Sequence, residues 1–574
     1  MTTAAQPQPQ KSAFWRDWRL FIPKSVTVIA QEGYSFAKLR ADAVAGLTVA
    51  IVAVPLAMAI AIASGVTPAQ GLITAVVAGF LISALGGARF QIGGPTGAFI
   101  VVVYGVVHQY GYDGLALATM MAGVVLIAAG LMRVGDWIKY IPEPVVVGFT
   151  AGIAVIIFWS QVRDLLGLSM TEVPADFLEK LTALWAAHQT VSIAAIGVAA
   201  GALAAIILVH RYLPGWPGFL IAVAGATAAV WAFKLPVETI GSRFGAEAAA
   251  AIPPLHLPEI SITRLQQLLP SALTIAFLAG VESLLSAMVA DGMTGRRHRS
   301  NCEIVAQGVA NIAAPIFGGI SATGAIARTA TNIRAGAQSP FAGMFHALFV
   351  LIFMLALGPV IALVPLASLA AVLAVVAWNM SERERFRQLL LGLAGDRLVL
   401  LATFLLTVLV DLTVAIEVGV VLAAVIFMHR MAEATAVSRG VSLIERDQDD
   451  FARPRDTYQA RAELPEGVEA FELRGPLFFG AASRLTDAFE AAFPPPRAFI
   501  LRFAEVPIAD ASGVHALERF LDRCRKHGVT VVICELRPQV SASLEKLGVL
   551  AHVQTTDSYG DAITLAANGA ERKP

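Results

Sequence analysis

Apolar stretches long enough to cross a bilayer follow one another between residues 43 and 432. Because lipid offers the backbone no hydrogen bonds, such segments fold as helices. The chain is 57% hydrophobic and only 15% charged, so most of it is predicted to lie in a membrane. Fourteen spans are predicted, at 43–63, 68–87, 95–108, 114–132, 143–161, 191–210, 218–234, 270–290, 303–317, 323–337, 341–359, 361–379, 397–411 and 413–430.

A Gly-rich phrase occurs twice inside this apolar region. Residues 93–99 read GGPTGAF, and residues 318–326 read GGISATGAI. Upstream, LTVA at 47–50 is matched by LTIA at 273–276. The two pairs are offset by 226 and 227 residues, so the register holds across about two bilayer spans. The chain is therefore predicted to contain two structural repeats.

The repeats are predicted at about 43–234 and 270–432, with seven spans in each. An odd number of spans per half inverts the second repeat relative to the first. The third and tenth spans, 95–108 and 323–337, are short and begin at the Gly-rich phrase. Paired interruptions of this kind are typical of the binding site of a secondary transporter.

The composition excludes several classes of function. With 42 basic and 42 acidic residues the net charge is zero, which argues against a nucleic-acid partner. The three cysteines show neither metal-ligand spacing nor a disulfide framework. No phosphate-binding loop is present, so transport driven by a gradient is expected. No nucleophile–base pair, metal cluster or cofactor loop is recognisable, so neither an enzyme nor a cofactor is predicted.

The loop charges predict the topology. Basic residues concentrate in the loops that share a side with the N-terminus, for example Arg133, Arg296 and Arg430, and acidic residues in the others. The positive-inside rule therefore places both termini in the cytoplasm, with an even number of spans in the cytoplasmic (inner) membrane. Residues 1–42 are predicted to form a cytoplasmic N-terminal region without a signal peptide.

The composition changes after residue 432. Residues 433–466 are charged and are predicted to be a linker. Residues 467–570 alternate strands (468–473, 498–503, 529–534) with helices (480–492, 512–526, 541–547), which predicts a small cytoplasmic α/β domain. Asp510 or Ser512 suits the N-cap of its second helix. Ser512 is thus either a capping residue or a possible regulatory phosphorylation site.

The repeated phrases supply candidate ligands for an anion. Two helix N-termini meeting at the midplane would offer free N–H groups and partial positive charge. The alternative is that the small residues only allow close helix packing, but duplication at a fixed offset favours a site. The candidate substrate-binding residues are Thr96, Gly97, Ala98, Ser321, Thr323, Gly324, Ala325 and Arg328.

Two charged residues stand out within the spans. Glu282 is the single carboxylate of span 270–290, beside Ser283 and Ser286, and these three are the candidate coupling-ion residues. It could carry a proton, coordinate Na⁺ or pair with a cation, or be purely structural. Arg328 could attract the substrate, pair with Glu282 in the empty site, or snorkel to the cytoplasmic face as an anchor.

With these residues, the chain resembles the sulfate permease (SulP) family of secondary anion transporters. The resemblance covers about residues 40–570 and includes segments 55–65, 93–98, 282–291 and 324–332. It ends in a STAS domain, with the D-x-S-G turn of that domain at 510–513. The fold class predicted is an α-helical polytopic membrane protein of about 14 spans in a 7+7 inverted repeat, plus a small α/β STAS domain.

The resemblance also implies a mechanism. Spans 1–4 and 8–11 would form a core domain that moves against a gate domain in an elevator-type cycle, within a homodimer. The substrate would bind between the starts of spans 3 and 10. In bacterial relatives the position of Glu282 is implicated in H⁺ or Na⁺ coupling, and Arg328 matches a basic residue beside the anion site. A cytoplasmic regulator could act at the STAS domain.

One departure concerns the substrate. Many sulfate-transporting members carry P-Q-x-x-A-Y in the first span, whereas residues 55–60 read PLAMAI here. Loss of the amide and the phenol weakens the case for sulfate and favours bicarbonate or a dicarboxylate such as fumarate. Protonation of Glu282 would balance one anion charge, which favours H⁺ over Na⁺.

Three alternatives stay open from the sequence. The first is an uncoupled anion exchanger or channel, and the second is a nucleobase-type permease, which resembles this architecture. The third is a membrane-anchored signalling module in which the STAS domain is the output. Arg328 and the STAS domain weigh against the nucleobase permease.

Overall fold

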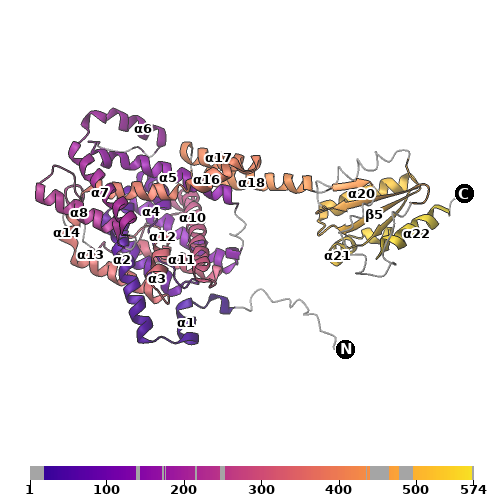
Figure 1. Cartoon of the computed structure of the whole chain (residues 1–574), viewed down its shortest axis with the longest axis horizontal. Helices are drawn as coiled ribbons and strands as arrows, with labels where there is room; N and C mark the ends of the chain where they lie inside the picture. Colours follow the sequence, from indigo (N-terminus) through magenta and orange to yellow (C-terminus); the bar gives the residue numbers. More distant parts are fainter. Residues whose placement is uncertain are drawn as a thin grey trace. The chain divides into compact units, whose positions relative to one another are not determined.

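The structure is a computed structural model that describes residues 18–136, 142–170, 174, 176–213, 216–245, 252–410, 412–434, 436–439, 464–477 and 495–571. The chain divides into two compact units, residues 1–421 and 422–574. The first unit is built from helices and the second is an α/β domain (Figure 1).

The helices of the first unit run on to α18, which continues past residue 421. Their bounds are α1 Lys24–Glu32, α2 Phe36–Ala63, α3 Pro68–Leu85, α4 Ile100–Leu131, α5 Glu143–Leu166, α6 Phe177–Ala186, α7 Ile193–Tyr212, α8 Gly218–Phe233, α9 Ile240–Phe244, α10 Ile262–Thr294, α11 Ser300–Ile316, α12 Ile326–Arg334, α13 Phe341–Ala356, α14 Gly358–Ala362, α15 Leu366–Met380, α16 Arg383–Leu391, α17 Ala394–Leu409 and α18 Leu412–Ala434. Seven helices in the described part of the chain are long and apolar enough to cross a membrane.

Each of the fourteen predicted spans coincides with a described helix or with half of one. The third and fourth spans are merged in α4, which is kinked at Gly111. There φ is 70°, a left-handed value that glycine adopts without steric cost. At the N-terminal end, α2 begins at Phe36 and not at residue 43, because Ser35 caps it by accepting from Lys38 N. The predicted N-terminal region 1–42 therefore also contains α1 and the first turns of α2.

The two Gly-rich phrases meet as a two-residue antiparallel ladder. Strand β1 (Gly93–Gly94) pairs with β2 (Thr323–Gly324), with Gly93 opposite Gly324. Next to the ladder, Ala325 N donates to the carbonyl oxygen of Ile92 at 2.9 Å. A 3-10 turn, Gly97–Phe99, then leads into α4, and α12 begins at Ile326. The two half-helices thus start from one crossing point, as an inverted repeat requires.

Close backbone contacts hold the helices around this crossing. Helix α4 packs on α10 and α11, and α13 packs on α2 and α3. At the α4–α11 contact, a Cβ atom built on Gly123 would lie 2.6 Å from the Gly308 oxygen, and the reverse distance is the same. Small residues allow membrane helices to approach this closely, and dispersion then stabilises the pair. A second set of helices, α7, α15 and α17, packs on α5.

The second unit contains a five-stranded sheet in the order β3-β4-β5-β6-β7. Strands β4 to β7 are parallel, and β3 is antiparallel to β4. The bounds are β3 Ala436–Arg439, β4 Val468–Arg474, β5 Ala498–Glu505, β6 Thr530–Cys534 and β7 Gln554–Thr556, with helices α20 Ala511–Lys526, α21 Pro538–Lys546 and α22 Tyr559–Glu571.

The sequence predicted most of this domain. The three predicted strands are present, and helices 512–526 and 541–547 agree with α20 and α21 within a few residues. The predicted helix 480–492 lies outside the described residues. The predicted linker 433–466 needs correction, because it contains β3, which the antiparallel pairing with β4 stabilises. Asp510 is the N-cap of α20 and accepts from Gly513 N at 2.7 Å, whereas Ser512 lies exposed in the first turn.

Candidate functional site

The crossing brings Glu282 of α10 against the start of the third span. Thr96 is only 8% exposed, and its Oγ1 donates to Glu282 Oε2 at 2.8 Å. Thr96 directly follows Pro95, which cannot donate a backbone hydrogen bond. A residue from the first repeat therefore holds the intramembrane carboxylate of the second repeat.

Arg328 approaches the same segment from α12. It is 2% exposed, and its Nη2 donates to the Pro95 carbonyl oxygen at 2.6 Å. Its Nε and Nη1 are buried without a hydrogen-bond partner. Unsatisfied N–H groups on a buried guanidinium are costly, so they are candidate donors to an anion. Burial excludes the interpretation of Arg328 as a snorkelling anchor.

One interpretation of Arg328 was an ion pair with Glu282 in the empty site. Among the described residues, no ion pair within 4.0 Å joins these two side chains; one bonds to Pro95 and the other to Thr96. The interpretation that they neutralise each other is therefore corrected for this conformation. Instead, the two groups contact consecutive residues of the chain: Arg328 bonds to Pro95, and Glu282 bonds to Thr96.

Two predicted hydroxyl ligands are engaged elsewhere. The Ser321 hydroxyl lies 2.7 Å from the Thr119 hydroxyl, and Thr323 Oγ1 donates to the Ala279 carbonyl at 2.8 Å. Both side chains are fully buried. Both hydroxyls help to fix the loop before α12 in this conformation, and substrate binding by Ser321 and Thr323 stays a prediction. The backbone N–H of Ala325 is also engaged, because it donates to the carbonyl oxygen of Ile92.

The small residues of the two phrases lie in tight surroundings. A Cβ atom on Gly97 would lie 2.8 Å from Met380 Sδ and 3.7 Å from Ile157 Cδ1. On Gly324 it would lie 1.7 Å from Gln91 Nε2. Ala98 is buried at 1% exposure. The glycines are therefore required by close packing around the crossing, and Gly97 faces α5 and α15.

Ser283 and Ser286 do not face Glu282 in the way that the sequence suggested. Ser283 Oγ accepts from Gln91 Nε2 at 2.7 Å and lies 3.3 Å from Glu303 Oε1. Ser286 Oγ donates to Thr329 at 3.1 Å. These bonds tie α10 to the β1 loop, α11 and α12. We find no hydrogen bond from either serine to Glu282 among the described residues.

Helix α11 carries a polar stripe that was not predicted from the sequence. Glu303, Gln307 and Asn311 are fully buried. Asn311 clamps Ala322, donating to its oxygen at 2.8 Å and accepting from its nitrogen at 2.9 Å. Glu303 accepts from Ala88 N and from Gln307, both at 2.9 Å. Their i, i+4, i+8 spacing within an apolar span was the signal available, since polar groups at that depth face the bundle interior.

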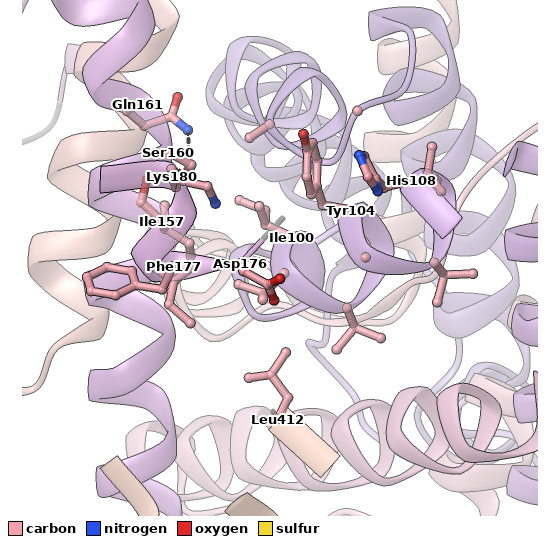
Figure 2. Close-up of a pocket in the computed structure, with 18 of the residues that line it drawn as sticks. Ile100, Tyr104, His108, Ile157, Ser160, Gln161, Asp176, Phe177, Lys180 and Leu412 are labelled. Carbon is pink, nitrogen blue, oxygen red and sulfur yellow. Dashed lines mark hydrogen bonds between the residues drawn. The ribbon is translucent and has the colours of Figure 1, made fainter. Parts of the chain in front are cut away.

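A cavity of about 940 Å³ lies along the first half of α4 (Figure 2). Its walls come mainly from the first half of α4 and from α5, α6 and the end of α17. None of the predicted site residues lines it, but it reaches Ile100 in the first turn of α4, and Ile157, which adjoins Gly97. The cavity therefore approaches the crossing from the side where α2 ends.

Lys180 is the most deeply buried cation of this cavity. It is 3% exposed, and its ammonium lies 5.6 Å from the centre of the Tyr104 ring. Figure 2 shows both side chains at the cavity wall, with Asp176 near them. Burial lowers the pKa of Lys180 to about 8, while the charge of Asp176 opposes this shift. Lys180 can thus lose its charge in a mildly alkaline medium.

Gly94 gives a test of the geometry at the crossing. Its φ is 147°, and a Cβ atom there would lie 2.6 Å from Arg328 Nη1. We expect Gly94→Ala to cost about 1–3 kcal/mol of stability from backbone strain alone and to displace Arg328. Thermal unfolding and anion uptake measure both effects. Gly197→Ala, which meets nothing within 4 Å, is the control and should leave both unchanged or slightly raise stability.

The fold and the crossing together define a class: polytopic membrane transporters whose inverted halves meet at two broken helices. A comparison with family models makes this specific. The sulfate permease family matches residues 39–403, and the STAS domain matches residues 459–562. The chain belongs to the sulfate permease family, a family of anion transporters, and the predicted fold class is confirmed.

Curated relatives cover nearly the whole chain. YvdB of Bacillus subtilis (strain 168), which carries a provisional sulfate-transporter name, is 42% identical over 90% of this chain and 95% of its own. The bicarbonate transporter BicA of Picosynechococcus sp. is 30% identical over 90% of this chain and 92% of its own.

Two solved structures are similar in fold. Murine Solute Carrier 26 family member A9, an anion transporter in the inward-facing state, has a TM-score of 0.84 at 19% identity. The alignment covers 98% of this chain and 97% of that one. The transmembrane domain of a cyanobacterial bicarbonate transporter BicA has a TM-score of 0.61 at 29% identity, covering 67% of this chain and 98% of that domain.

Proposed function

We propose that this protein is a secondary active transporter of small anions, coupled to H⁺ or Na⁺, and not an enzyme. The observation that carries the proposal is the pair of contacts on Pro95 and Thr96. Arg328 bonds to the first and Glu282 to the second. An anion at Arg328 and a proton or cation at Glu282 would therefore act on adjacent residues of one half-helix start, which gives the two sites a physical route to couple.

The proposed substrates are small oxyanions: bicarbonate, a dicarboxylate such as fumarate, or sulfate. The names of the relatives support bicarbonate and sulfate as family substrates. Residues 55–60, PLAMAI, lack the amide and phenol of many sulfate-transporting members, which favours bicarbonate or a dicarboxylate. An unpartnered N–H group of Arg328 Nε or Nη1 can donate a charge-assisted hydrogen bond to a carboxylate or carbonate oxygen.

H⁺ is the proposed coupling ion ahead of Na⁺. Protonation of Glu282 would offset one incoming negative charge without further ligands. A Na⁺ site at Glu282 would need additional oxygen atoms, and the hydroxyls of Ser283 and Ser286 already bond to Gln91, Glu303 and Thr329. Only the Thr96 hydroxyl contacts the carboxyl group among the hydrogen bonds of the described residues.

We propose an elevator-type cycle in which α2–α4 and α10–α13 move as a core against the other helices, within a homodimer. The β1–β2 ladder and the α4–α11 contact support a rigid core.

We propose that the protein lies in the inner membrane of the cell, with both of its termini in the cytoplasm. The Lys180 cavity is then the outer access route, and exposed Ser512 is a candidate regulatory site on the STAS domain.

Uptake into proteoliposomes tests the proposal. Labelled bicarbonate, sulfate and fumarate are compared under separate inward H⁺ and Na⁺ gradients, with uracil as a competitor. Accumulation of one anion under one gradient supports coupled transport. Strictly downhill flux would favour the exchanger or channel, and competition by uracil the nucleobase permease. Absence of any anion flux from correctly folded protein would overturn the proposal and leave the signalling module.

Because Lys180 loses its charge at alkaline pH, we expect the affinity of the protein for external anions to fall as the pH rises. The other charged or titratable groups lining the cavity are Tyr104, His108, Arg163, Asp164, Asp176 and Arg243. Lys180 carries its charge below pH 8 and loses it above. We expect KM to rise about tenfold between pH 7 and pH 9, as for loss of one charge-assisted contact. Lys180→Arg should flatten this dependence, because arginine stays charged; an unchanged profile in that variant would exclude Lys180.

A further inference from the structure

A second cavity, of about 300 Å³, lies at the N-terminal end of the membrane unit, away from the candidate site. It is enclosed by α1, the loop between α3 and β1, and the end of α10 with the loop that follows it. Its lining is strongly basic, and in the sequence Arg296 indicated only the membrane topology. The basic side chains are Lys24, Arg89, Arg296, Arg297 and Arg299, and the acidic ones are Glu32 and Asp291.

Both acidic groups are already engaged. Glu32 accepts from Arg89 at 2.5 and 2.6 Å and from Arg296 at 3.0 Å. The hydrogen bonds from Arg89 hold the pKa of Glu32 at about 2, so it stays ionised. Asp291 accepts from the backbone nitrogen and Nδ1 of His298, at 3.0 and 2.7 Å. Neither carboxylate remains to neutralise the other cations of the cavity.

The remaining cations carry uncompensated charge. Lys24 and Arg297 pair with no carboxylate among the described residues, and Arg299 donates to the carbonyl oxygen of Ile22 at 2.5 Å. Burial, and then the charges of Arg299 and Arg89, lower the pKa of Lys24. With five basic and two acidic groups, the cavity has an excess of three positive charges. A cavity of this size and charge suits a phosphate group.

The surroundings of the cavity point to a lipid as the source of that phosphate. Helix α1 turns Lys24 to the cavity while Val26 and Ile29 are 53% and 47% exposed. Phe36, at the start of α2, is 80% exposed. A short helix with a basic side and exposed apolar side chains is typical of the membrane interface. Basic pockets beside the cytoplasmic ends of membrane helices bind anionic headgroups.

We propose that this basic cavity binds the phosphate of an anionic phospholipid, with Lys24 and Arg297 as its free cationic ligands and the acyl chains beside Val26 and Ile29. The bound phosphate would bridge α1 to the loop that follows α10, the helix that carries Glu282. The inference does not depend on the transported anion, since it concerns a separate cavity and its readout is lipid binding.

The test uses the full-length protein, delipidated in detergent and titrated with dioleoyl phosphatidylglycerol or, as the neutral lipid, dioleoyl phosphatidylcholine. Native mass spectrometry measures retained lipid and thermal unfolding measures stabilisation. We expect phosphatidylglycerol to bind preferentially. The double variant Lys24→Gln/Arg297→Gln should weaken its binding about tenfold or more, since each cation near the headgroup contributes to binding.

The matched control removes two exposed cations outside the cavity, in the variant Arg19→Gln/Arg40→Gln. It should keep the binding within about twofold of the wild type, because screened surface charges contribute little. Equal losses in both double variants would show general surface attraction and overturn the site, as would unchanged binding in Lys24→Gln/Arg297→Gln. If soluble glycerol 3-phosphate stabilised the protein as much as phosphatidylglycerol does, the ligand of the cavity would be a free phosphate ester and not a lipid. The Tm of each variant in phosphatidylcholine checks its folding.

Discussion

Glu282→Gln is expected to abolish anion accumulation while leaving downhill flux measurable. The carboxyl group of Glu282 accepts from Thr96 at 2.8 Å, and a glutamine oxygen can keep that hydrogen bond. It cannot take up a proton or balance a cation. For an electroneutral 1:1 symporter with H⁺, each pH unit of inward gradient supports about tenfold accumulation. We expect this ratio to fall to about one in the variant, measured as labelled anion retained in proteoliposomes at steady state.

Glu303→Gln is the matched control for this prediction. Glu303 is also a buried carboxylate on a membrane helix, but its hydrogen-bond partners among the described residues are Ala88 N, Gln307 and Ser283, and not Thr96. We expect its loss to lower the Tm, because a buried acceptor network is disturbed, and to leave the gradient dependence intact. If Glu282→Gln still accumulates anion like the wild type, then Glu282 is structural and the coupling scheme is wrong.

Arg328→Gln is expected to raise the KM for the transported anion by about 30-fold or more, which corresponds to truncating one partner of a buried charge pair. The guanidinium is 2% exposed, and its Nε and Nη1 have no protein partner. An anion would accept a hydrogen bond from one of these two nitrogens. Arg328→Lys should be intermediate, because it keeps the charge but not the planar fork that reaches Pro95 as well. Initial uptake rates against anion concentration give the KM values.

The control on the same helix is Arg334→Gln. Arg334 lies exposed in the last turn of α12 and carries the same charge. We expect its KM to stay within about twofold of the wild type, since exposed charges are well screened. Similar losses in Arg328→Gln and Arg334→Gln would mean that general electrostatic attraction, and not a site at Arg328, sets the affinity.

The repeat carried most of the sequence-based prediction. Apolar runs must become helices in lipid, and a phrase duplicated at a constant offset marks equivalent places in two halves. The meeting of β1 and β2 follows from these two constraints. Glu282 could be singled out because an isolated carboxylate in an apolar span is costly without a role. Its contact with Thr96 was consistent with that expectation but not derivable from it.

The hydrogen-bond partners of the site residues could not be predicted from the sequence. Ser321 and Thr323 share their phrase with Gly324, but the rotation of α4 and α10 decides that they bond to Thr119 and Ala279. A backbone carbonyl such as that of Pro95 has no signature in the sequence, so the partners considered for Arg328 were the substrate and Glu282. The stripe on α11 was readable in principle from its i, i+4, i+8 spacing, and was missed because Glu303 is the first residue of the predicted span 303–317.

The position of the bound anion tests the central claim most directly. We would determine the structure by cryo-electron microscopy in nanodiscs with the best transported of bicarbonate, sulfate and fumarate at saturating concentration. We expect density within hydrogen-bond distance of Arg328 Nε or Nη1, beside Pro95 and Gly97. Density confined to the Lys180 cavity, or none at the β1–β2 crossing, would contradict it.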